Sequence, residues 1–142
     1  MSQITVEVEV SAPIDKVWEY YTKPEHITKW AFASDDWHCP RATNDLTVGG
    51  RFVTRMEEVD GDEGFDFSGT YTDVVQNKLI AYTMDQAPDE LLARKALVTF
   101  APQGSGTHVE VSFDPETENP PEVQLAGWQA ILDNFKNHVE GA

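Results

Sequence analysis

The amino-acid sequence predicts an α+β fold in which a curved antiparallel sheet of about six or seven strands wraps around one long C-terminal helix. Residues 119–139 repeat apolar side chains with the period of a helix that lies on a core. Most of the chain before them consists of short segments in which apolar and polar residues alternate, as in strands with one buried face. Because strands joined by short turns pair antiparallel and an apolar sheet face needs a cover, we expect the long helix to cover the sheet.

The first part of the chain predicts one strand and two short helices. Residues 4–10 alternate branched apolar residues with polar ones, which predicts a strand. Pro13 is suited to open a helix, and Thr22 and Glu25, which flank Pro24, match the capping box of a second short helix. The apolar positions of the first helix recur at helical spacing; they are Ile14, Val17, Trp18 and Tyr21.

The middle of the chain predicts a loop followed by a meander of strands. Residues 31–43 have no consistent period and contain Pro40, so we expect a loop that folds against the body. Residues 44–48 fit a short strand, and Gly49-Gly50 fits a tight turn or a bulge. The alternating segments after this turn are residues 51–58, 65–72, 79–85, 96–100 and 109–113.

Turn signals separate these segments. Residues 60–62 and 103–106 are typical of tight hairpin turns. Residues 86–94 form a longer connection with room for a helical turn, and we expect this connection to shape the mouth of a cavity. In the segment 65–72 the aromatic residues share one face, which we expect to be buried; they are Phe65, Phe67 and Tyr71.

The long C-terminal helix has a well-marked start. Asn119 fits the N-cap position, Pro120 fits the first turn, and Glu122 completes a capping box. Gln124 is the one polar residue within the apolar stripe. Gly127 lies in mid-helix, where it costs about 1 kcal/mol relative to alanine, so we expect another group to pass close by. The apolar stripe consists of Leu125, Trp128, Ile131, Leu132, Phe135 and Val139.

Length and composition restrict the class of protein. A chain of 142 residues suits one domain, and we expect residues 1–142 to form it. The net charge of −15 disfavours nucleic acid and anionic membranes as partners. The single cysteine excludes an intrachain disulfide, the first residues alternate unlike a signal peptide, and no apolar run is long enough for a membrane span. We therefore expect a cytoplasmic protein.

Several short motifs are spread along the chain: Ala12-Pro13 with Val17-Trp18, Pro24 with Trp30, Gly49-Gly50, Gly69-x-Tyr71 and Gly127-Trp128. Together they resemble the START-like (SRPBCC) superfamily, whose members have the helix-grip fold. Within it the sequence is most similar to the group homologous to the C-terminal domain of the activator of heat-shock-90 ATPase. The resemblance implies a cavity between sheet and long helix that is often used for apolar small molecules. It leaves a chaperone or a second copy of the chain open as a partner.

The densest polar cluster lies in the predicted loop at residues 31–43. Asp35, Asp36, His38 and Cys39 include metal-ligating types, but a zinc site needs ligand pairs at set spacings, and no CxxC or HxxxH pattern occurs. We expect no metal and no cofactor. His38 is the candidate general base, because an imidazole titrates near neutrality. Cys39 is expected to be a packed, inert thiol.

The aromatic residues exceed what a modest core needs, so we expect some of them to line a cavity under the curved sheet. Gln124 and the tyrosine hydroxyls would then be polar anchors. Arg55 would join them only if a bulge at Gly50 exchanged the two faces of its strand; otherwise it faces water. The candidate ligand-binding residues are Trp30, Phe52, Phe67, Tyr71, Tyr82, Gln124, Trp128, Ile131, Phe135 and Arg55.

These observations predict a module that binds a small hydrophobic or aromatic molecule, and nothing in the sequence requires turnover. Two alternatives stay open. The first is a cyclase- or hydrolase-type enzyme that uses His38 or a carboxylate at the cavity mouth. The second is a co-chaperone-like surface that binds another protein.

Overall fold

The computed structural model describes residues 3–85, 94–117 and 119–141. The predicted order of one strand, two short helices, a strand meander and a long helix is confirmed. Most of the predicted connection over residues 86–94 lies outside the described residues. No helix in the described part of the chain is long and apolar enough to cross a membrane. The elements are β1 (Ile4–Val10), α1 (Ile14–Thr22), α2 (Pro24–Ile27), β2 (Trp37–Asn44), β3 (Arg51–Glu58), β4 (Gly64–Val75), β5 (Leu79–Met84), β6 (Lys95–Gln103), β7 (Gly106–Phe113) and α3 (Pro121–Glu140).

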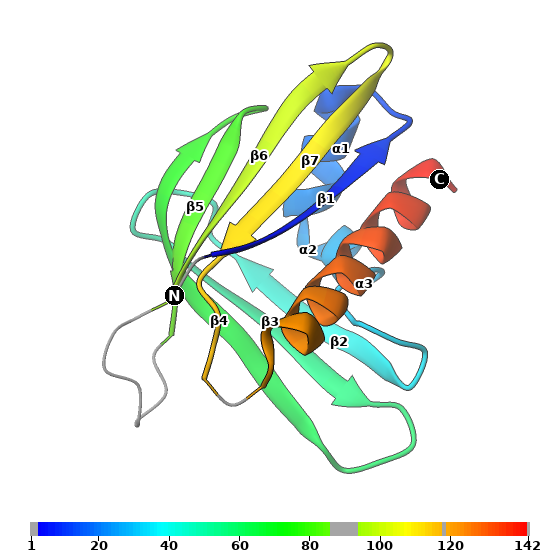
Figure 1. Ribbon diagram of the computed structural model, residues 1–142, viewed down its shortest axis with the longest axis vertical. Coiled ribbons are helices and arrows are strands. Elements are labelled where there is room, and N and C mark those ends of the chain that lie inside the picture. Colours follow the sequence, from blue (N-terminus) through cyan, green and yellow to red (C-terminus); the bar gives the residue numbers. More distant parts are fainter. Residues whose placement is uncertain (1–2, 86–93, 118, 142) are drawn as a thin grey trace.

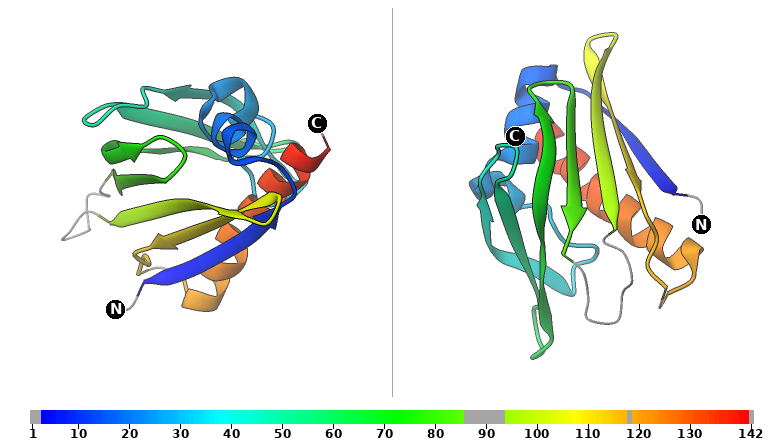
Figure 2. Two further views of the ribbon diagram at one scale, coloured as in Figure 1. Left: turned by 90° about the horizontal axis from the view of Figure 1, so that it is seen from above. Right: turned by 90° about the vertical axis from the view of Figure 1, so that its left-hand side faces the viewer.

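The strands form one curved antiparallel sheet in the order β1-β7-β6-β5-β4-β3-β2. Neighbours in the chain are neighbours in the sheet except for β1, which pairs with β7, because α1 and α2 carry the chain from one edge to the other. The sheet curls into an arc, and α3 lies across its open side (Figures 1 and 2). The fold is therefore the predicted helix-grip arrangement.

Helix α3 is fastened to the edge strand β1 by side chains that reach its backbone. The Gln129 amide nitrogen donates to the Glu7 carbonyl at 3.0 Å, and the Lys136 ammonium donates to the Glu9 carbonyl at 2.6 Å. An edge strand presents unpaired carbonyls that such donors can satisfy. These hydrogen bonds hold α3 against the edge of the sheet that β1 forms.

The core lies between the concave face of the sheet and the helices. In β1 the alternating residues Ile4, Val6, Val8 and Val10 are all buried, as the pattern predicted. Side chains that are almost completely buried come from β1, β6, β7, α1 and α3. They include Val17, Val98, Val109, Phe113, Phe135 and Val139.

The region predicted as a loop contains an edge strand, which corrects the sequence interpretation. Residues 37–44 form β2, and the register with β3 shifts between His38 and Arg41. Pro40 lies within this irregularity, where an edge strand tolerates a residue without an N–H group. The irregularity breaks the alternation, so the pattern indicated a loop. The predicted strand at 44–48 is also wrong, because residues 45–50 turn, with the Gly50 N–H donating to the Thr47 carbonyl at 2.8 Å.

Both predicted side-chain caps are wrong. The Thr22 hydroxyl donates back to the Trp18 carbonyl at 2.8 Å, so it ends α1 and does not cap α2. The Asn119 amide donates to the Glu116 carboxylate, and α3 starts at Pro121 without a side-chain cap. The reason is the pair Pro120-Pro121, since a residue that precedes proline is disfavoured in the helical region and the second proline then opens the helix.

Three expectations about packing are corrected as well. Leu125, predicted in the buried stripe, is 45% exposed, and Phe65 is 48% exposed. A side-chain atom added at Gly127 would have none of the described residues within 4 Å, so the expected close approach is not found in this part of the structure. Leu125 lies in the first turns of α3 and Phe65 near the start of β4, where the period continues but less of the chain covers the side chain.

Candidate functional site

A pocket of about 320 Å³ lies between the concave face of the sheet and α3. Its lining includes residues of β1, α1, α2, β2, β3, β4, β5, β7 and α3. Eight of the ten candidate ligand-binding residues are part of this lining. They are Trp30, Phe52, Phe67, Tyr71, Tyr82, Gln124, Trp128 and Ile131.

Two candidates lie outside the lining. Arg55 is on the outer face of the sheet, where its Nε donates to the Glu57 carboxylate at 2.8 Å and its Nη1 lies 3.5 Å from the Asp66 carboxylate. The pairing of β3 with β4 runs without a shift, so the exchange of faces that would have turned Arg55 inward does not occur. Phe135 is completely buried, with its ring edge-on to Tyr21 and Trp30 at 5.1 Å each, and belongs to the core beside the pocket.

The aromatic wall of the pocket depends on Gly69. A side-chain atom at this position would lie 2.2 Å from the Thr83 carbonyl oxygen and 2.8 Å from the Phe52 ring. Phe52 pairs with Gly69 across β3 and β4, so its ring lies over the glycine and reaches the rings of Tyr71 at 5.3 Å and Tyr82 at 4.9 Å. A residue without a side chain therefore lets one aromatic ring cover the sheet and bring three rings together.

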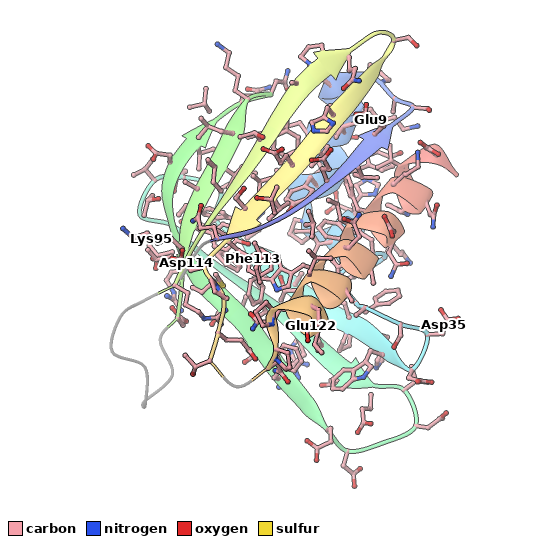
Figure 3. The ribbon with its side chains drawn as sticks, in the orientation of Figure 1. Glu9, Asp35, Lys95, Phe113, Asp114 and Glu122 are labelled. Carbon is pink, nitrogen blue, oxygen red and sulfur yellow. The ribbon has the colours of Figure 1, made fainter. Side chains whose placement is uncertain are left out.

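Helix α3 forms the opposite wall through Trp128. Its indole stacks on the Phe113 ring at 3.9 Å with an interplanar angle of 11°, and it meets the Phe67 ring edge-on at 5.8 Å. Phe113, at the end of β7, points into the space between the sheet and α3 (Figure 3). Trp128 thus contacts two strands, β7 and β4, and holds the helix against both of them.

Gln124 is buried, as its position in the apolar stripe predicted, but its amide is used by the chain itself. The amide oxygen accepts from the Glu116 N–H at 2.8 Å. The amide nitrogen donates to the Glu116 carbonyl at 3.1 Å and to the Asn119 carbonyl at 2.7 Å. Both functional ends of the amide are therefore committed to the segment before α3, and Gln124 shapes the pocket without being free to anchor a ligand.

Three tyrosines supply hydroxyl groups to the pocket. Tyr71 donates to the Asn44 side-chain oxygen at 2.5 Å, and the Asn44 amide nitrogen donates to the Thr22 carbonyl at 2.6 Å. Among the described residues, the hydroxyls of Tyr21 and Tyr82 make no hydrogen bond. Burial raises the pKa of all three hydroxyls, so they are neutral at physiological pH.

Tyr21, Arg94 and Glu116 line the pocket and were not recognised as site residues in the sequence. Tyr21 was assigned to a helix face, which did not distinguish core from pocket. Arg94 precedes Ala96 by two residues, so extending the alternation of β6 backwards places it on the inward face. The Met84 N–H donates to the Arg94 carbonyl at 2.8 Å and extends the ladder to this residue. The strand period was thus the available signal for Arg94.

The polar cluster at residues 35–39 does not reach the pocket. His38 is exposed on the edge strand β2, and Asp35 lies at the loop before this strand, at the periphery of the molecule (Figure 3). Cys39 is buried, and its Sγ lies 3.4 Å from the Arg41 carbonyl. Burial raises the pKa of the Cys39 thiol, which favours the unreactive thiol form.

A second group of polar side chains lies on the outer face of β1 and β7. Ligand atoms of Glu7, His108 and Glu110 lie within 4.8 Å of one another. His108 Nδ1 is 2.5 Å from the Glu9 carboxylate, which orients the ring. Imidazole and carboxylate are zinc ligands, but Glu7 is exposed and the group is separated from the pocket by the sheet.

The curved sheet, the long covering helix and the two short helices after β1 define a START-like domain of the helix-grip type. The chain belongs to the family described as "Activator of Hsp90 ATPase homolog 1-like protein", whose model matches residues 11–140.

Solved structures from several bacteria share this fold. The AHSA1-like protein of Aeromonas hydrophila is 42% identical, with a TM-score of 0.88 over 98% of this chain and 92% of that chain. A Cytophaga hutchinsonii protein is 49% identical, with a TM-score of 0.80 over 98% of this chain and 92% of that chain. A Chromobacterium violaceum protein at 24% identity has a TM-score of 0.85 over 98% of this chain and 97% of that chain and supports the fold alone. No curated protein sequence matches this chain.

Proposed function

We propose that this protein binds a small hydrophobic or aromatic molecule in the pocket between the sheet and α3. The observation that carries this proposal is the composition of the lining, which is mostly aromatic and aliphatic with a few polar groups. Ligand sites typically combine such an apolar surface with a small number of polar groups that fix orientation. The volume of about 320 Å³ lies at the small end of ligand pockets, so the ligand is small as well.

The enzymatic alternative lacks a comparable observation. A hydrolytic or cyclase-type reaction needs a general base within reach of the bound molecule. Of the described residues that line the pocket, Glu116 is the one carboxylate, and the lining contains no histidine. His38, the candidate base, is exposed on β2 and outside the lining. Glu116 is therefore the remaining candidate for the predicted cavity-mouth carboxylate, and its carboxylate accepts a hydrogen bond from the Asn119 amide. The mostly apolar lining favours binding over turnover.

The family description names an activator of the Hsp90 ATPase, so family membership supports a ligand-binding or a co-chaperone-like module. A co-chaperone role is thus a second possibility at the level of the family, and the mostly apolar lining of the pocket favours the ligand-binding role. A ligand found in the pocket would support ligand binding without excluding a co-chaperone role.

The direct test is native mass spectrometry of freshly purified protein, combined with thermal-shift measurements against a library of apolar and aromatic compounds. We expect a co-purifying small molecule or a set of stabilising compounds. Substitution Ile131→Trp fills the pocket from α3 and should abolish the ligand-induced shift. Asp133→Trp, at an exposed position of the same helix, is the matched control and should retain it. Absence of any ligand together with no stabilising compound would count decisively against the proposal.

A further inference from the structure

The three pocket tyrosines come from different elements and meet at one place. Tyr71 and Tyr82 are directly opposite each other in the pairing of β4 with β5, with ring centroids 6.4 Å apart. Tyr21 comes from α1, and its ring is held edge-on by Phe100 at 5.4 Å and Phe135 at 5.1 Å in the core. With its ring fixed by the core, Tyr21 contributes to the pocket lining alongside the other two.

The three hydroxyls differ in their hydrogen bonding. The Asn44 amide nitrogen donates to the Thr22 carbonyl, so the Asn44 side-chain oxygen faces Tyr71 and accepts the hydrogen bond from its hydroxyl. The hydroxyls of Tyr21 and Tyr82 have no partner among the described residues, and Tyr82 is only 8% exposed. Neither hydroxyl is among the fully buried polar atoms that lack a partner in the described part of the chain, and both tyrosines line the pocket. A ligand oxygen that displaces water there must accept from these hydroxyls, because a desolvated hydroxyl without an acceptor is unfavourable. Two donors therefore remain available in the pocket.

The electrostatic environment keeps these groups as donors. Burial is the main cause that raises the pKa of Tyr21 and Tyr82, and the neighbouring tyrosines raise it further. The positive charge of Arg94 acts on the pKa of Tyr82 in the opposite direction, which places the guanidinium near this hydroxyl. Arg94 also lines the pocket. A cation beside two neutral donors favours an oxygen atom that carries negative charge.

We propose that the Tyr21 and Tyr82 hydroxyls form a donor pair for one oxygen atom of the ligand, so that the ligand is an aromatic or apolar molecule with a carbonyl or carboxylate oxygen. This inference rests on the proposed function, because it names a subsite of the same pocket. It excludes plain hydrocarbons as the preferred ligands and assigns the two hydroxyls a binding role beyond packing.

The test uses three naphthalene probes of similar shape that differ in one group. The probes are 2-acetylnaphthalene, which has a ketone; 2-naphthoate, which has a carboxylate; and 2-isopropenylnaphthalene, in which a CH₂ group replaces the ketone oxygen. Each is titrated into the full chain and into the variants Tyr21→Phe and Tyr82→Phe. The matched control is Tyr20→Phe, because Tyr20 is on the same helix as Tyr21 but stacks on His26 outside the pocket lining.

We expect each pocket variant to raise the dissociation constant of the ketone about fivefold, the usual effect of one lost hydrogen bond. The dissociation constant of the hydrocarbon should change by less than about twofold. The carbonyl stretch of the bound ketone should move to higher frequency in the same variants. Tyr20→Phe should change none of these values. Tighter binding of the ketone or of naphthoate identifies which oxygen the subsite prefers, and Arg94→Gln should weaken naphthoate more than the ketone.

Two failures are distinguishable. If the three probes bind the wild-type chain equally and neither phenylalanine variant changes their ratios, the donor pair is refuted while ligand binding in the pocket stands. If no probe binds and native mass spectrometry finds no ligand, the proposed function fails, and this inference fails with it. The phenylalanine variants should melt no lower than the wild type, because each removes a hydroxyl without a protein partner.

Discussion

The two halves of α3 have the same apolar period but different surroundings. In the C-terminal half, Phe135 and Val139 are completely buried in the core. In the N-terminal half, Val123 and Leu125 are about half exposed, and Gln124 and Trp128 line the pocket. The comparison shows that one amphipathic helix can anchor a domain at one end and form a pocket wall at the other.

The difference between the halves follows from what each half contacts. The C-terminal half packs on rings from α1 and the segment after α2, such as Tyr21 and Trp30. The N-terminal half is held by Gln124, which bonds the segment before the helix, and by Trp128, which stacks on Phe113. Side chains fill the space around Phe135 and Val139, whereas the pocket lies beside the N-terminal half and reaches Ile131 and Leu132 at the start of the C-terminal half. Substitutions in the two halves should therefore have different consequences.

The largest effect is expected for Phe135→Ala in the C-terminal half. Removing a completely buried ring leaves a cavity in the core and should lower the free energy of unfolding by about 3–5 kcal/mol. Urea denaturation followed by tryptophan fluorescence measures this change. Phe135→Leu, which retains most of the volume, should cost less than half as much. A loss below about 1 kcal/mol for Phe135→Ala would show that this half is not the anchor.

The next effect is expected for Gln124→Ala in the N-terminal half. The substitution leaves the Glu116 N–H and two carbonyls without their partners and should cost about 1–3 kcal/mol. Leu125→Ala is the control, because this neighbouring side chain is 45% exposed. If urea denaturation gave the same loss of unfolding free energy for both substitutions, the hydrogen bonds of Gln124 would not be what holds the N-terminal half of α3 in place.

The third effect has the opposite sign. Gly127→Ala should raise the free energy of unfolding by about 1 kcal/mol, because alanine is the better helix former and the added atom meets nothing within 4 Å. The reverse change at the exposed neighbouring position, Ala126→Gly, should lower it by a similar amount. Destabilisation by Gly127→Ala would show that another group lies beside the N-terminal half of α3 and clashes with the added methyl group.

The sequence was most informative wherever the alternation ran unbroken. The face of β1 and the inward positions Phe52, Phe67 and Tyr82 followed from the strand period alone. The edge strand β2 could not be recognised, because Pro40 and the register shift interrupt the period. The period shows which side chains share a face, but it does not show where packing ends and a pocket begins.

Polar site residues were harder to assign, because their roles depend on contacts between distant segments. Gln124 was recognised as buried, but its partners belong to an irregular segment whose path no period describes. Arg55 was proposed through a bulge that would have moved it inward, whereas the regular register keeps it outside. Arg94 lies just beyond a recognised strand, so its inward face required one further step of alternation.

The smallest effect concerns the pH dependence of the C-terminal half. His138 on α3 and His26 on α2 share a hydrogen bond of 3.0 Å between Nε2 and Nδ1, and the Tyr20 ring stacks on His26 at 3.8 Å. Burial lowers the pKa of His138, and the nearby positive charges of His26, Lys29 and Lys16 lower it further. The folded protein therefore binds a proton at His138 less readily than the unfolded chain.

This contribution to stability is fully present above the ordinary histidine pKa of about 6.5 and is lost as the pH falls through the lower value in the folded state. His138→Gln should thus reduce the loss of unfolding free energy between about pH 7 and pH 5. The reduction should be smaller than the change in unfolding free energy expected for Gly127→Ala. His38→Gln on the exposed edge of β2 is the control and should leave the decline unchanged. An identical pH profile for His138→Gln and the wild type would show that the histidine pair does not make the anchored half of α3 sensitive to acid.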